Sequence, residues 1–237
     1  MAADMPVAPI YTKAPPVAMD LWTGAYIGVS LGGRWTTESW QTTGTFGSKE
    51  YESSSARVGL YGGYNWQVRP DWIVGIEADI AWANNHASLN AIPGITGASR
   101  TGTSELKDIG DGGIRARLGY LVAPDLMVFA TGGVSWIQNE ANASSVTTTR
   151  ISNYCAPDTI VTTRGADSTS STQAGWTLGG GIEKVVAKNW LLRGEYRYSS
   201  YGSQKVSLMQ GAQRITTDLG SHSTQTAMIG IAYQFGN

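Results

Sequence analysis

The stretch Gly62-Gly-Tyr-Asn-Trp-Gln-Val-Arg-Pro-Asp-Trp-Ile-Val-Gly-Ile-Glu77 contains two runs in which side-chain character alternates, joined by a tight turn. Pro70 presets φ for the turn and Asp71 can bond back to the local backbone, so the stretch predicts a β-hairpin. Two later segments repeat the pattern around Ala123-Pro-Asp125 and Ala187-Lys-Asn189. The chain is therefore expected to contain antiparallel strands that are joined in pairs.

Eight segments of the chain show this period-two alternation, and most have the length of a tilted membrane strand, roughly 9 to 11 residues plus overhang. The expected strands are residues 24–35, 56–68, 72–83, 110–122, 126–138, 174–186, 190–201 and 224–235. Short connections follow the second, fourth and sixth strands. Long connections follow the first, third, fifth and seventh strands, at residues 36–55, 84–109, 139–173 and 202–223. Short periplasmic turns and long extracellular loops are typical of outer-membrane barrels.

The two faces of the expected strands differ in chemistry. In residues 72–83, one face is apolar with Trp at both ends, while the other carries Glu77 and Asp79. A soluble barrel of the lipocalin type would show the same alternation with its apolar face inside, and it is the alternative. The polar face favours a membrane barrel because it combines Gly with charges of both signs, whereas Lys is almost confined to turns and loops.

Charged side chains inside a barrel are expected to form networks, because an unpaired buried charge costs several kcal/mol. The interior charge network predicted from the strand phases comprises Arg34, Arg57, Glu77, Asp79, Asp111, Arg115, Arg117, Glu183, Arg193, Glu195 and Arg197. Inward glycines could leave small water-filled cavities between these charges, and the expected positions are Gly28, Gly59, Gly63, Gly75, Gly113, Gly119, Gly133 and Gly179. An eight-stranded barrel is only about wide enough for its own side chains, so at most a narrow conductance is expected.

The composition supports a membrane setting. The chain has nine Trp and eleven Tyr against three Phe, and Trp and Tyr are the residues that prefer membrane interfaces. The expected interfacial aromatic belt comprises Trp66, Trp72, Trp82, Tyr120, Trp190, Tyr233 and Phe235. The sequence lacks the roughly 20 consecutive apolar residues of a membrane helix. A formal charge of −1 shows no basic excess that would point to nucleic acid.

The predicted fold class is all-β: an eight-stranded antiparallel up-and-down transmembrane β-barrel. Residues 22–237 are expected to form this barrel domain, and residues 1–21 to form a Pro-rich periplasmic segment, since Pro disfavours both helix and central strand. Ala2 and Ala3 are interpreted as lying near the site where a signal peptide is removed.

Catalysis finds little support in the residues. Glu77 with Asp79, or Glu183 with Glu195, would be the carboxylate pairs for acid–base chemistry, but interior carboxylates that face arginines are expected to stay ionised. The sequence has no Gly-x-Ser-x-Gly nucleophile elbow between a strand and a helix. We predict that the protein is not an enzyme.

Other reactive residue types are sparse. His86 and His222 fall in expected external loops without metal-ligand spacing, so we predict surface histidines, no metal site and no cofactor. Cys155 is the single cysteine and cannot form an internal disulfide. It is expected to be an unpaired loop thiol, with pairing between molecules as the alternative.

The opening Trp22-Thr-Gly-Ala-Tyr-Ile-Gly28, the Pro-Asp turns and the final Gly230-Ile-Ala-Tyr-Gln-Phe235 resemble small outer-membrane barrels of the OmpA-like and opacity-type superfamily. The likeness is strongest to the immunogenic, porin-like outer-membrane proteins of alphaproteobacteria and covers about residues 22–235. Members of the superfamily generally end in an aromatic residue that resembles a signal for the barrel-assembly machinery. Here Gly236 and Asn237 follow Phe235.

This resemblance implies a place in the outer membrane of a Gram-negative bacterium. It also implies roles in envelope integrity, limited permeability and host contact, and haem binding in some relatives. The implied partners are outer-membrane lipid and lipopolysaccharide, the barrel-assembly machinery during biogenesis, and a host or phage surface ligand.

The expected function is an outer-membrane protein that contributes to envelope structure and surface contact, with at most narrow porin-like conductance. The long connections are rich in Ser, Thr, Gly and Asn, and such polar, exposed segments are suited to binding. The alternatives are a soluble ligand-binding β-barrel and an outer-membrane receptor for haem or a host surface.

Overall fold

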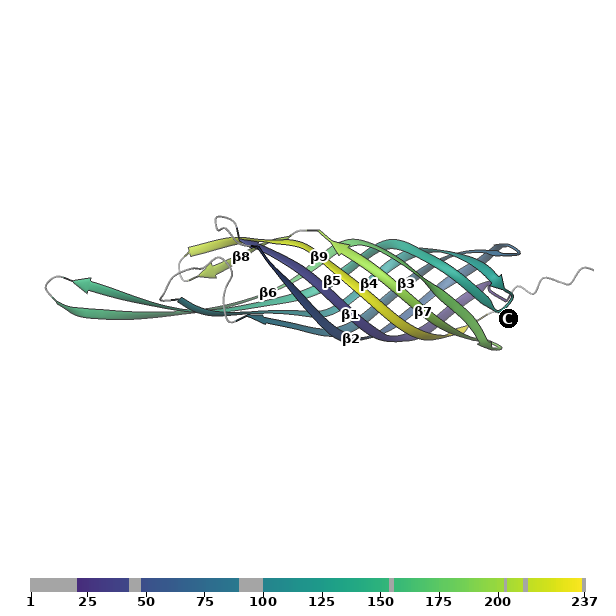
Figure 1. Cartoon of the computed structure of the whole chain (residues 1–237), viewed down its shortest axis with the longest axis horizontal. Coiled ribbons are helices and arrows are strands. Elements are labelled where there is room, and N and C mark those ends of the chain that lie inside the picture. The colour runs from purple at the N-terminus through teal and green to yellow at the C-terminus, as the bar shows by residue number, and fades with distance from the viewer. Residues whose placement is uncertain are drawn as a thin grey trace, which may run out of the picture.

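In the part of the chain that the structure describes, nine strands form a single antiparallel sheet that closes on itself (Figure 1). The computed structural model describes residues 21–42, 48–89, 100–153, 156–202, 204–210 and 213–235. The strands are β1 (Gly24–Thr42), β2 (Ser48–Arg69), β3 (Trp72–Leu89), β4 (Arg100–Ala123), β5 (Leu126–Asn153), β6 (Ala156–Ala187), β7 (Trp190–Tyr201), β8 (Gln204–Gln210) and β9 (Gln213–Gln234).

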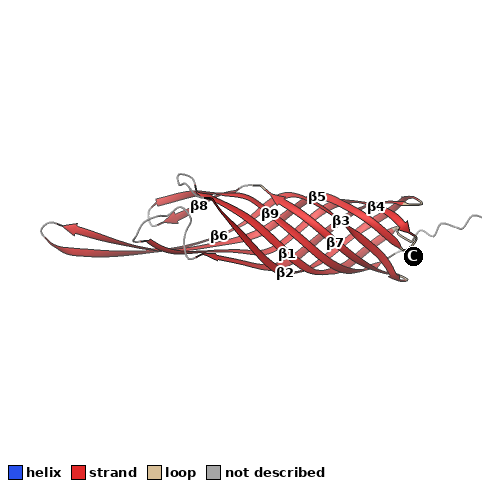
Figure 2. Ribbon diagram, in the orientation of Figure 1, coloured by secondary structure: helices blue, strands red, loops and turns tan. Residues whose placement is uncertain are grey.

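Closure of the sheet is made by β1 and β9, which pair from Tyr26↔Gln234 to Thr42↔Thr217. The strands β1 to β7 and β9 therefore form a ring of eight, as predicted. The short strand β8 pairs with the N-terminal part of β9, from Gln204↔Leu219 to Gln210↔Gln213. Strands account for the regular structure drawn in Figure 2. The described ranges contain no helix that is long and apolar enough to cross a membrane.

The three tight turns lie together at one end of the barrel, which we call the turn end. Their backbone is tied to the neighbouring strand in each case. The amide of Leu121 donates to the carbonyl of Asp71 at 2.9 Å, and that of Val185 donates to the carbonyl of Asp125 at 2.9 Å. At the third turn, the amide of Gln234 donates to the carbonyl of Asn189 at 2.8 Å. The predicted hairpins are confirmed.

The opposite end of the barrel differs from the prediction, because the long connections are strands over most of their described length. The longest pair is β5 with β6, whose pairing continues past the barrel from Asn139↔Ser171 to Asn153↔Ala156. Figure 1 shows this pair reaching furthest from the barrel. We call it the β5–β6 ribbon and its side of the molecule the ribbon end. Thr faces Thr along it, as at Thr148↔Thr162, and β-branched residues favour strands.

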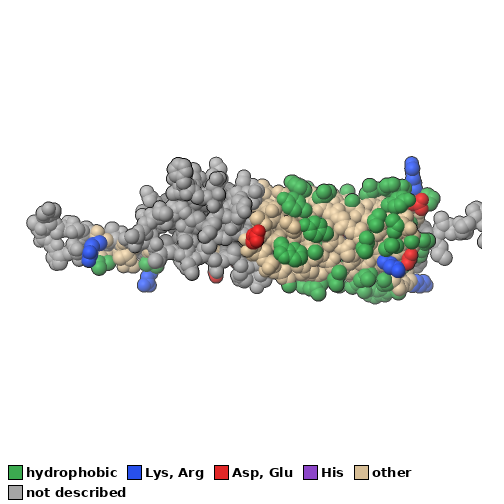
Figure 3. Space-filling model, viewed as in Figure 1, with side chains coloured by type: hydrophobic (Ala, Val, Ile, Leu, Met, Phe, Trp, Pro, Cys, Tyr) green, Lys and Arg blue, Asp and Glu red, His purple; other side chains and the backbone are tan. Residues whose placement is uncertain are grey.

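The outer wall of the barrel is apolar. The side chains of Ile229, Leu178 and Val134 are 66%, 60% and 59% exposed, although these residues lie in the middle of strands. Figure 3 shows hydrophobic side chains over the described wall, with Lys, Arg, Asp and Glu near its ends. A large apolar surface of this kind needs a non-aqueous partner. The alternative of a soluble barrel with an apolar interior is therefore wrong.

Two aromatic belts border this wall. The turn-end belt contains Trp66, Trp72, Tyr120, Trp190, Tyr233 and Phe235, and its rings pack in pairs such as Trp72–Tyr120 at 5.2 Å and Trp190–Tyr233 at 5.4 Å. Trp82, which was predicted for the interfacial belt, lies ten residues beyond Trp72 along β3. Together with Trp35, Trp136 and Trp176 it forms a ribbon-end belt, ten or eleven residues from the turn end of each strand. Ten residues span about 33 Å, or roughly 25 Å after a strand tilt of about 40°, which is the height of a bilayer-facing band.

Candidate functional site in the charged interior of the barrel

The inner face of the strands carries the charges. The structure places all eleven residues of the predicted interior network inside the barrel, ten of them buried and Asp111 with its side chain 12% exposed. Asp108 joins them with its side chain 9% exposed. Sequence reasoning missed Asp108 because it fell in the connection 84–109, which was expected to be an irregular loop rather than part of β4.

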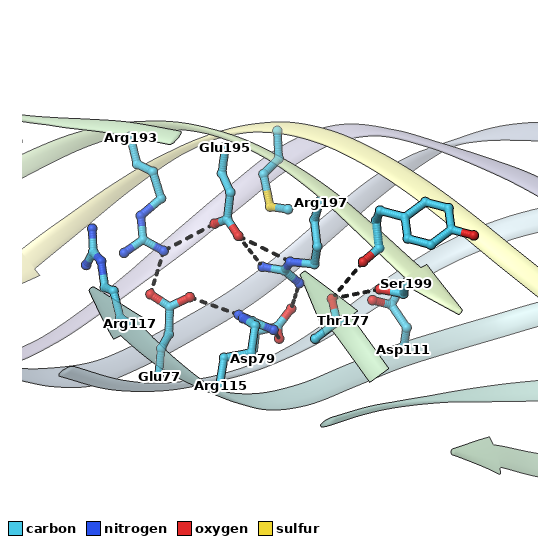
Figure 4. A network of polar contacts seen from close by, with 12 residues as sticks. Glu77, Asp79, Asp111, Arg115, Arg117, Thr177, Arg193, Glu195, Arg197 and Ser199 are labelled. Atoms are coloured by element: carbon cyan, nitrogen blue, oxygen red, sulfur yellow. Dashed lines mark hydrogen bonds and ion pairs between the residues drawn. The ribbon is translucent and has the colours of Figure 1, made fainter. Parts of the chain in front are cut away.

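The middle of the network is built on β3, β4 and β7 (Figure 4). Arg115 reaches Glu77 through Nη2 at 2.9 Å and Asp79 through Nη1 at 2.5 Å. Arg197 crosses the barrel to Asp79 at 3.0 Å and pairs with Glu195 at 3.0 Å. Both arginines thus bridge two carboxylates.

On the turn-end side, Arg193 is the most connected cation. Its Nη1 lies 2.6 Å from Glu77 Oε2 and 3.5 Å from Glu195 Oε2, and its Nε donates to Glu183 Oε2 at 2.7 Å. Arg117 Nη2 lies 2.9 Å from the same Glu183 oxygen. Three strands are therefore tied to one guanidinium group.

On the ribbon-end side, Arg57 continues the network. Its Nη2 lies 2.7 Å from Asp79 Oδ2 and 2.6 Å from Asp111 Oδ2. Arg34 then pairs with Asp111 at 3.0 Å and with Asp108 at 3.5 Å. The ion pairs form one connected network of six arginines and six carboxylates, so its formal charge is zero.

This balance determines what the interior can do. Buried ions are tolerated when each has hydrogen-bonded partners of opposite sign. Glu77 and Asp79 are both held by arginines, and so are Glu183 and Glu195. The two carboxylate pairs that sequence reasoning considered for acid–base chemistry thus serve as ion-pair acceptors in a packed lumen.

A cluster of apolar side chains closes the barrel on the turn-end side of the charge network. We call it the turn-end plug; it comprises Trp22, Tyr26, Tyr61, Ile73, Met127, Phe129, Leu191 and Ala232. Residues 21–23, which precede β1, fold into the opening, where Trp22 Nε1 donates to the carbonyl of Pro124 at 3.1 Å. The hydroxyl of Thr23 accepts from the amide of Gln67 at 3.0 Å. The segment 21–23 is therefore part of the barrel core.

Aromatic rings join the plug to the network. The Arg117 guanidinium lies 4.1 Å from the centroid of the Phe129 ring, and that of Arg193 lies 4.3 Å from the Tyr61 ring. Cation–π contacts of this kind strengthen when water is excluded. Tyr26 also donates from its hydroxyl to Glu77 Oε2 at 2.8 Å. The aromatic residues of the plug therefore contact the charged residues of the network directly.

Neighbouring side chains occupy the space beside three of the inward glycines that were expected to border small cavities. A Cβ on Gly28 would lie 2.7 Å from the Tyr61 ring, and one on Gly63 would lie 2.7 Å from the Tyr26 hydroxyl. A Cβ on Gly179 would lie 2.9 Å from the hydroxyl of Thr131. At Gly28 and Gly63 a Cβ would also meet a backbone carbonyl of the neighbouring strand, so both the backbone and the inward side chains restrict these positions to glycine.

At the ribbon end, His222 is buried with 1% exposure, so its prediction as a surface histidine is wrong. The reason is that β9 continues through the expected loop, and alternation then turns residue 222 inward with Thr224 and Thr226. Its ring packs against Tyr201 at 5.5 Å.

The predictions for two further residues, His86 and Cys155, are not tested by the structure. The side chain of His86 and the whole of Cys155 lie outside the described residues. Within the described part of the chain, no three or more His, Cys, Asp or Glu side chains are grouped so that they could hold a metal ion.

A closed antiparallel barrel with an apolar wall between two aromatic belts and an ion-paired polar interior is a transmembrane β-barrel, the class that spans bacterial outer membranes. The family model for the outer membrane protein beta-barrel domain matches residues 10–235, and the chain belongs to this family.

Relatives agree with this assignment. The 31 kDa outer-membrane immunogenic protein of Brucella melitensis biotype 1 is 29% identical, over 99% of this chain and 93% of its own length. The 22 kDa outer membrane protein of Rhizobium leguminosarum bv. viciae is 26% identical, over 84% of this chain and 74% of its own. The resemblance to alphaproteobacterial outer-membrane proteins is therefore confirmed, and with it a location in the outer membrane of a Gram-negative bacterium.

Among solved structures, the outer membrane protein OprG of Pseudomonas aeruginosa has the same fold. Its TM-score is 0.52 at 12% sequence identity, and the match covers 91% of this chain and 98% of that one.

Proposed function

We propose that this protein is a closed, non-enzymatic outer-membrane barrel that contributes to envelope structure and carries β-ribbons to the cell surface for contact. The observation that carries the proposal is the filled lumen. The turn-end plug, the balanced charge network and the Tyr201–His222 pair follow one another along the barrel axis.

The filling argues against a wide diffusion pore. An ion that entered from the turn end would meet buried Trp22, Ile73 and Leu191 first. It would then have to displace side chains whose ion pairs span several strands, and breaking a buried ion pair costs about 3–5 kcal/mol. Any conductance is therefore expected to be narrow.

The two ends of the barrel support the assignment of sides. Outer-membrane barrels place their short turns in the periplasm and their long connections outside. On this basis the β5–β6 ribbon is extracellular, and the chain enters the barrel from the periplasmic side, since Trp22 lies at the turn end. The Brucella relatives are named immunogenic, which supports surface exposure. A host or phage ligand, lipopolysaccharide and the barrel-assembly machinery are the proposed partners.

Planar-bilayer recording on the refolded protein tests the closed lumen, with a general porin in the same membrane as a positive control. We expect no steps of porin size. Reproducible large steps would overturn the closed-barrel proposal.

Trypsin treatment of intact cells tests the assignment of sides. Arg150 and Arg164 are exposed on the ribbon, whereas Lys188 is exposed at the turn end. We expect cleavage after the two ribbon arginines and none after Lys188. Cleavage after Lys188 in intact cells would reverse the orientation.

A further inference from the structure

Residues 21–23, which we call the strap, cross the opening at the turn end of the barrel. In the ring of eight strands, hairpin turns join β2 to β3, β4 to β5 and β6 to β7. No hairpin turn joins β1 to β9, the first and the last strand that the structure describes, and we call their junction the seam. The seam lies opposite the β4–β5 turn, because four strands separate the two in either direction around the ring.

The strap is bonded to strands on both sides of the seam. The carbonyl of Thr23 accepts from Gln234 Nε2 at 3.3 Å, which ties the strap to β9. The Thr23 hydroxyl accepts from the Gln67 amide at 3.0 Å, which ties it to β2. Gln234 is itself buried and held by the β6–β7 turn, because Asn189 Nδ2 donates to its carbonyl at 2.9 Å. The strap thus links the two sides of the seam, as a hairpin turn does elsewhere.

Trp22 extends this link across the opening to the opposite turn. Its side chain is 1% exposed, and its Nε1 donates to the carbonyl of Pro124 in the β4–β5 turn at 3.1 Å. The Trp22 ring belongs to the turn-end plug, and Leu21 packs against the same plug. An indole buries a wide apolar area while its single N–H keeps a partner. The strap is therefore held both at the seam and at the point that faces the seam.

Gly24, the first residue of β1, turns the chain from the seam into the lumen. Its φ of 146° is a value that side chains rarely adopt. A Cβ at this position would also collide with the carbonyl oxygen of Phe235, which directly follows β9. The amide of Phe235 donates to the carbonyl of Ala25 at 2.7 Å, so the two backbones are in close contact here. Glycine at this position thus allows the strap to leave the seam and enter the opening.

We propose that the strap holds the seam closed: it docks only after β1 and β9 have paired, and it then slows their separation. The order follows from its partners. Gln234, Gln67 and Pro124 belong to separate parts of the sheet, and closure of the ring brings them around one opening. Contacts that form after the rate-limiting step of folding change the rate of unfolding and leave the rate of folding nearly unchanged. The seam is accordingly the place at which the barrel opens when it unfolds.

Unfolding rates test the proposal on the full-length protein refolded in detergent micelles. The rate is read from the heat-dependent mobility shift at successive times after transfer to urea. We expect Trp22→Ala to unfold about a hundredfold faster and to refold at the native rate, because the contacts of a buried aromatic side chain are lost and those contacts form late. Slower refolding of Trp22→Ala, with little change in unfolding, would show that the strap docks before closure and would overturn the proposal.

A disulfide across the seam separates the holding of the seam from ordinary core packing. Val29 and Ile231 are outward residues that pair directly across β1 and β9. Both are replaced by Cys in a Cys155→Ser background, since directly paired residues of an antiparallel ladder have a Cα separation that suits a disulfide. Once the bond holds the seam, Trp22→Ala should accelerate unfolding by less than about threefold, because the two changes act on the same step.

Two controls accompany this measurement. The first places the disulfide at Leu60 and Ile80, which are outward and pair directly across β2 and β3, away from the seam. With that bond oxidised, the effect of Trp22→Ala is expected to remain at its full size. The second control replaces Ile73, a fully buried plug residue of β3, by Ala. Its acceleration of unfolding should be the same with the seam disulfide oxidised or reduced, because Ile73 stabilises the plug rather than the seam.

Two outcomes of the disulfide experiment would contradict the proposal. If Trp22→Ala accelerates unfolding equally with the seam disulfide oxidised and reduced, the strap acts only as core packing. If the Leu60–Ile80 disulfide suppresses the effect as well, the seam is not the place of opening.

Thr23→Val is the second variant, and it keeps the test decisive if Trp22→Ala does not fold. This change removes only the hydroxyl that accepts from the Gln67 amide. We expect unfolding to be about tenfold faster, because a donor at the strap loses its partner. The seam disulfide should suppress this acceleration too, and an acceleration that persists under the oxidised seam would overturn the proposal.

Discussion

Arg193 shows how one residue organises the lumen of this barrel. It pairs with Glu77, Glu183 and Glu195, and its guanidinium also lies over the Tyr61 ring. An arginine suits this place because its planar group presents several donors at once and remains charged when buried. The residue therefore joins the charged layer to the apolar plug.

Replacement of this residue by an uncharged side chain of similar length is expected to be costly. Arg193→Met leaves Glu183 and Glu77 with one fewer cation each, and we expect the free energy of unfolding to fall by about 3–5 kcal/mol. Urea unfolding in detergent micelles, followed by Trp fluorescence, measures the change. The double variant Arg193→Met/Glu183→Gln should recover part of the loss.

Lys184→Met is the control for this experiment, because Lys184 makes an exposed pair with Asp125 at 3.6 Å. Exposed ion pairs contribute little to stability, so the urea unfolding midpoint of Lys184→Met should stay close to that of the native protein. Equal midpoints for Arg193→Met and Lys184→Met would contradict the structural role of the network.

Gly28 tests the packing of the lumen at the smallest scale. An added Cβ would meet the Tyr61 ring and the Cβ of Ala232, each at 2.7 Å. We expect Gly28→Ala to lower the free energy of unfolding by about 1–3 kcal/mol through overpacking. Gly194→Ala is the matched control, since its Cβ would find only Ile182 at 3.8 Å. A Gly28→Ala protein as stable as this control would argue for free space in the lumen.

At the scale of elements, the barrel and the β5–β6 ribbon are stabilised differently. Each strand within the barrel has two paired neighbours, whereas beyond Thr147 the edge of β5 that faces β4 has no further pairing in the described register. The exposed Ile160 and Thr162 face solvent rather than a core. The ribbon is thus expected to add surface for contact rather than stability to the barrel.

Shortening the ribbon tests this separation. Replacement of residues 142–168 by an Asn-Gly turn keeps the pair Ala141↔Thr169 and supplies residues that favour a two-residue hairpin. We expect the heat-dependent mobility shift and the urea midpoint to remain as in the native protein, while binding to any ribbon-directed antibody is lost. A barrel that no longer folds would show that the ribbon is part of the folding unit.

At the scale of the whole molecule, closure of the sheet by β1 and β9 gives the barrel two unlike surfaces. Its outer wall exposes Ile229, Leu178 and similar side chains, and its interior holds paired charges. Such an arrangement is stable only where the wall meets hydrocarbon, because backbone polar groups are satisfied by the closed ladder and apolar side chains are not hydrated.

The protein is therefore expected to depend on a membrane or detergent. After refolding in micelles, dilution below the critical micelle concentration should lead to aggregation, measured by analytical ultracentrifugation. The micelle-bound sample at the same protein concentration is the control. A stable monomer in plain buffer would contradict the membrane-facing wall.

The sequence by itself determined the strands within the barrel, the hairpin turns and the inward face of eleven of the twelve network charges. This was possible because successive Cβ atoms of a strand point to opposite sides, so that the polar phase around Glu77 or Arg115 can be followed along the chain. The same rule could not place Asp108 or His222, since the extent of β4 and β9 beyond the barrel depends on pairing with a neighbouring strand.

Only the tertiary structure decided which charges meet. Arg197 and Asp79 are 118 residues apart, and they pair because closure of the sheet brings β7 opposite β3 across the lumen. Trp22 reaches Pro124 over 102 residues and thereby closes the turn end. Alternation acts within a strand, whereas these contacts follow from the register between strands and from the curvature of the closed sheet.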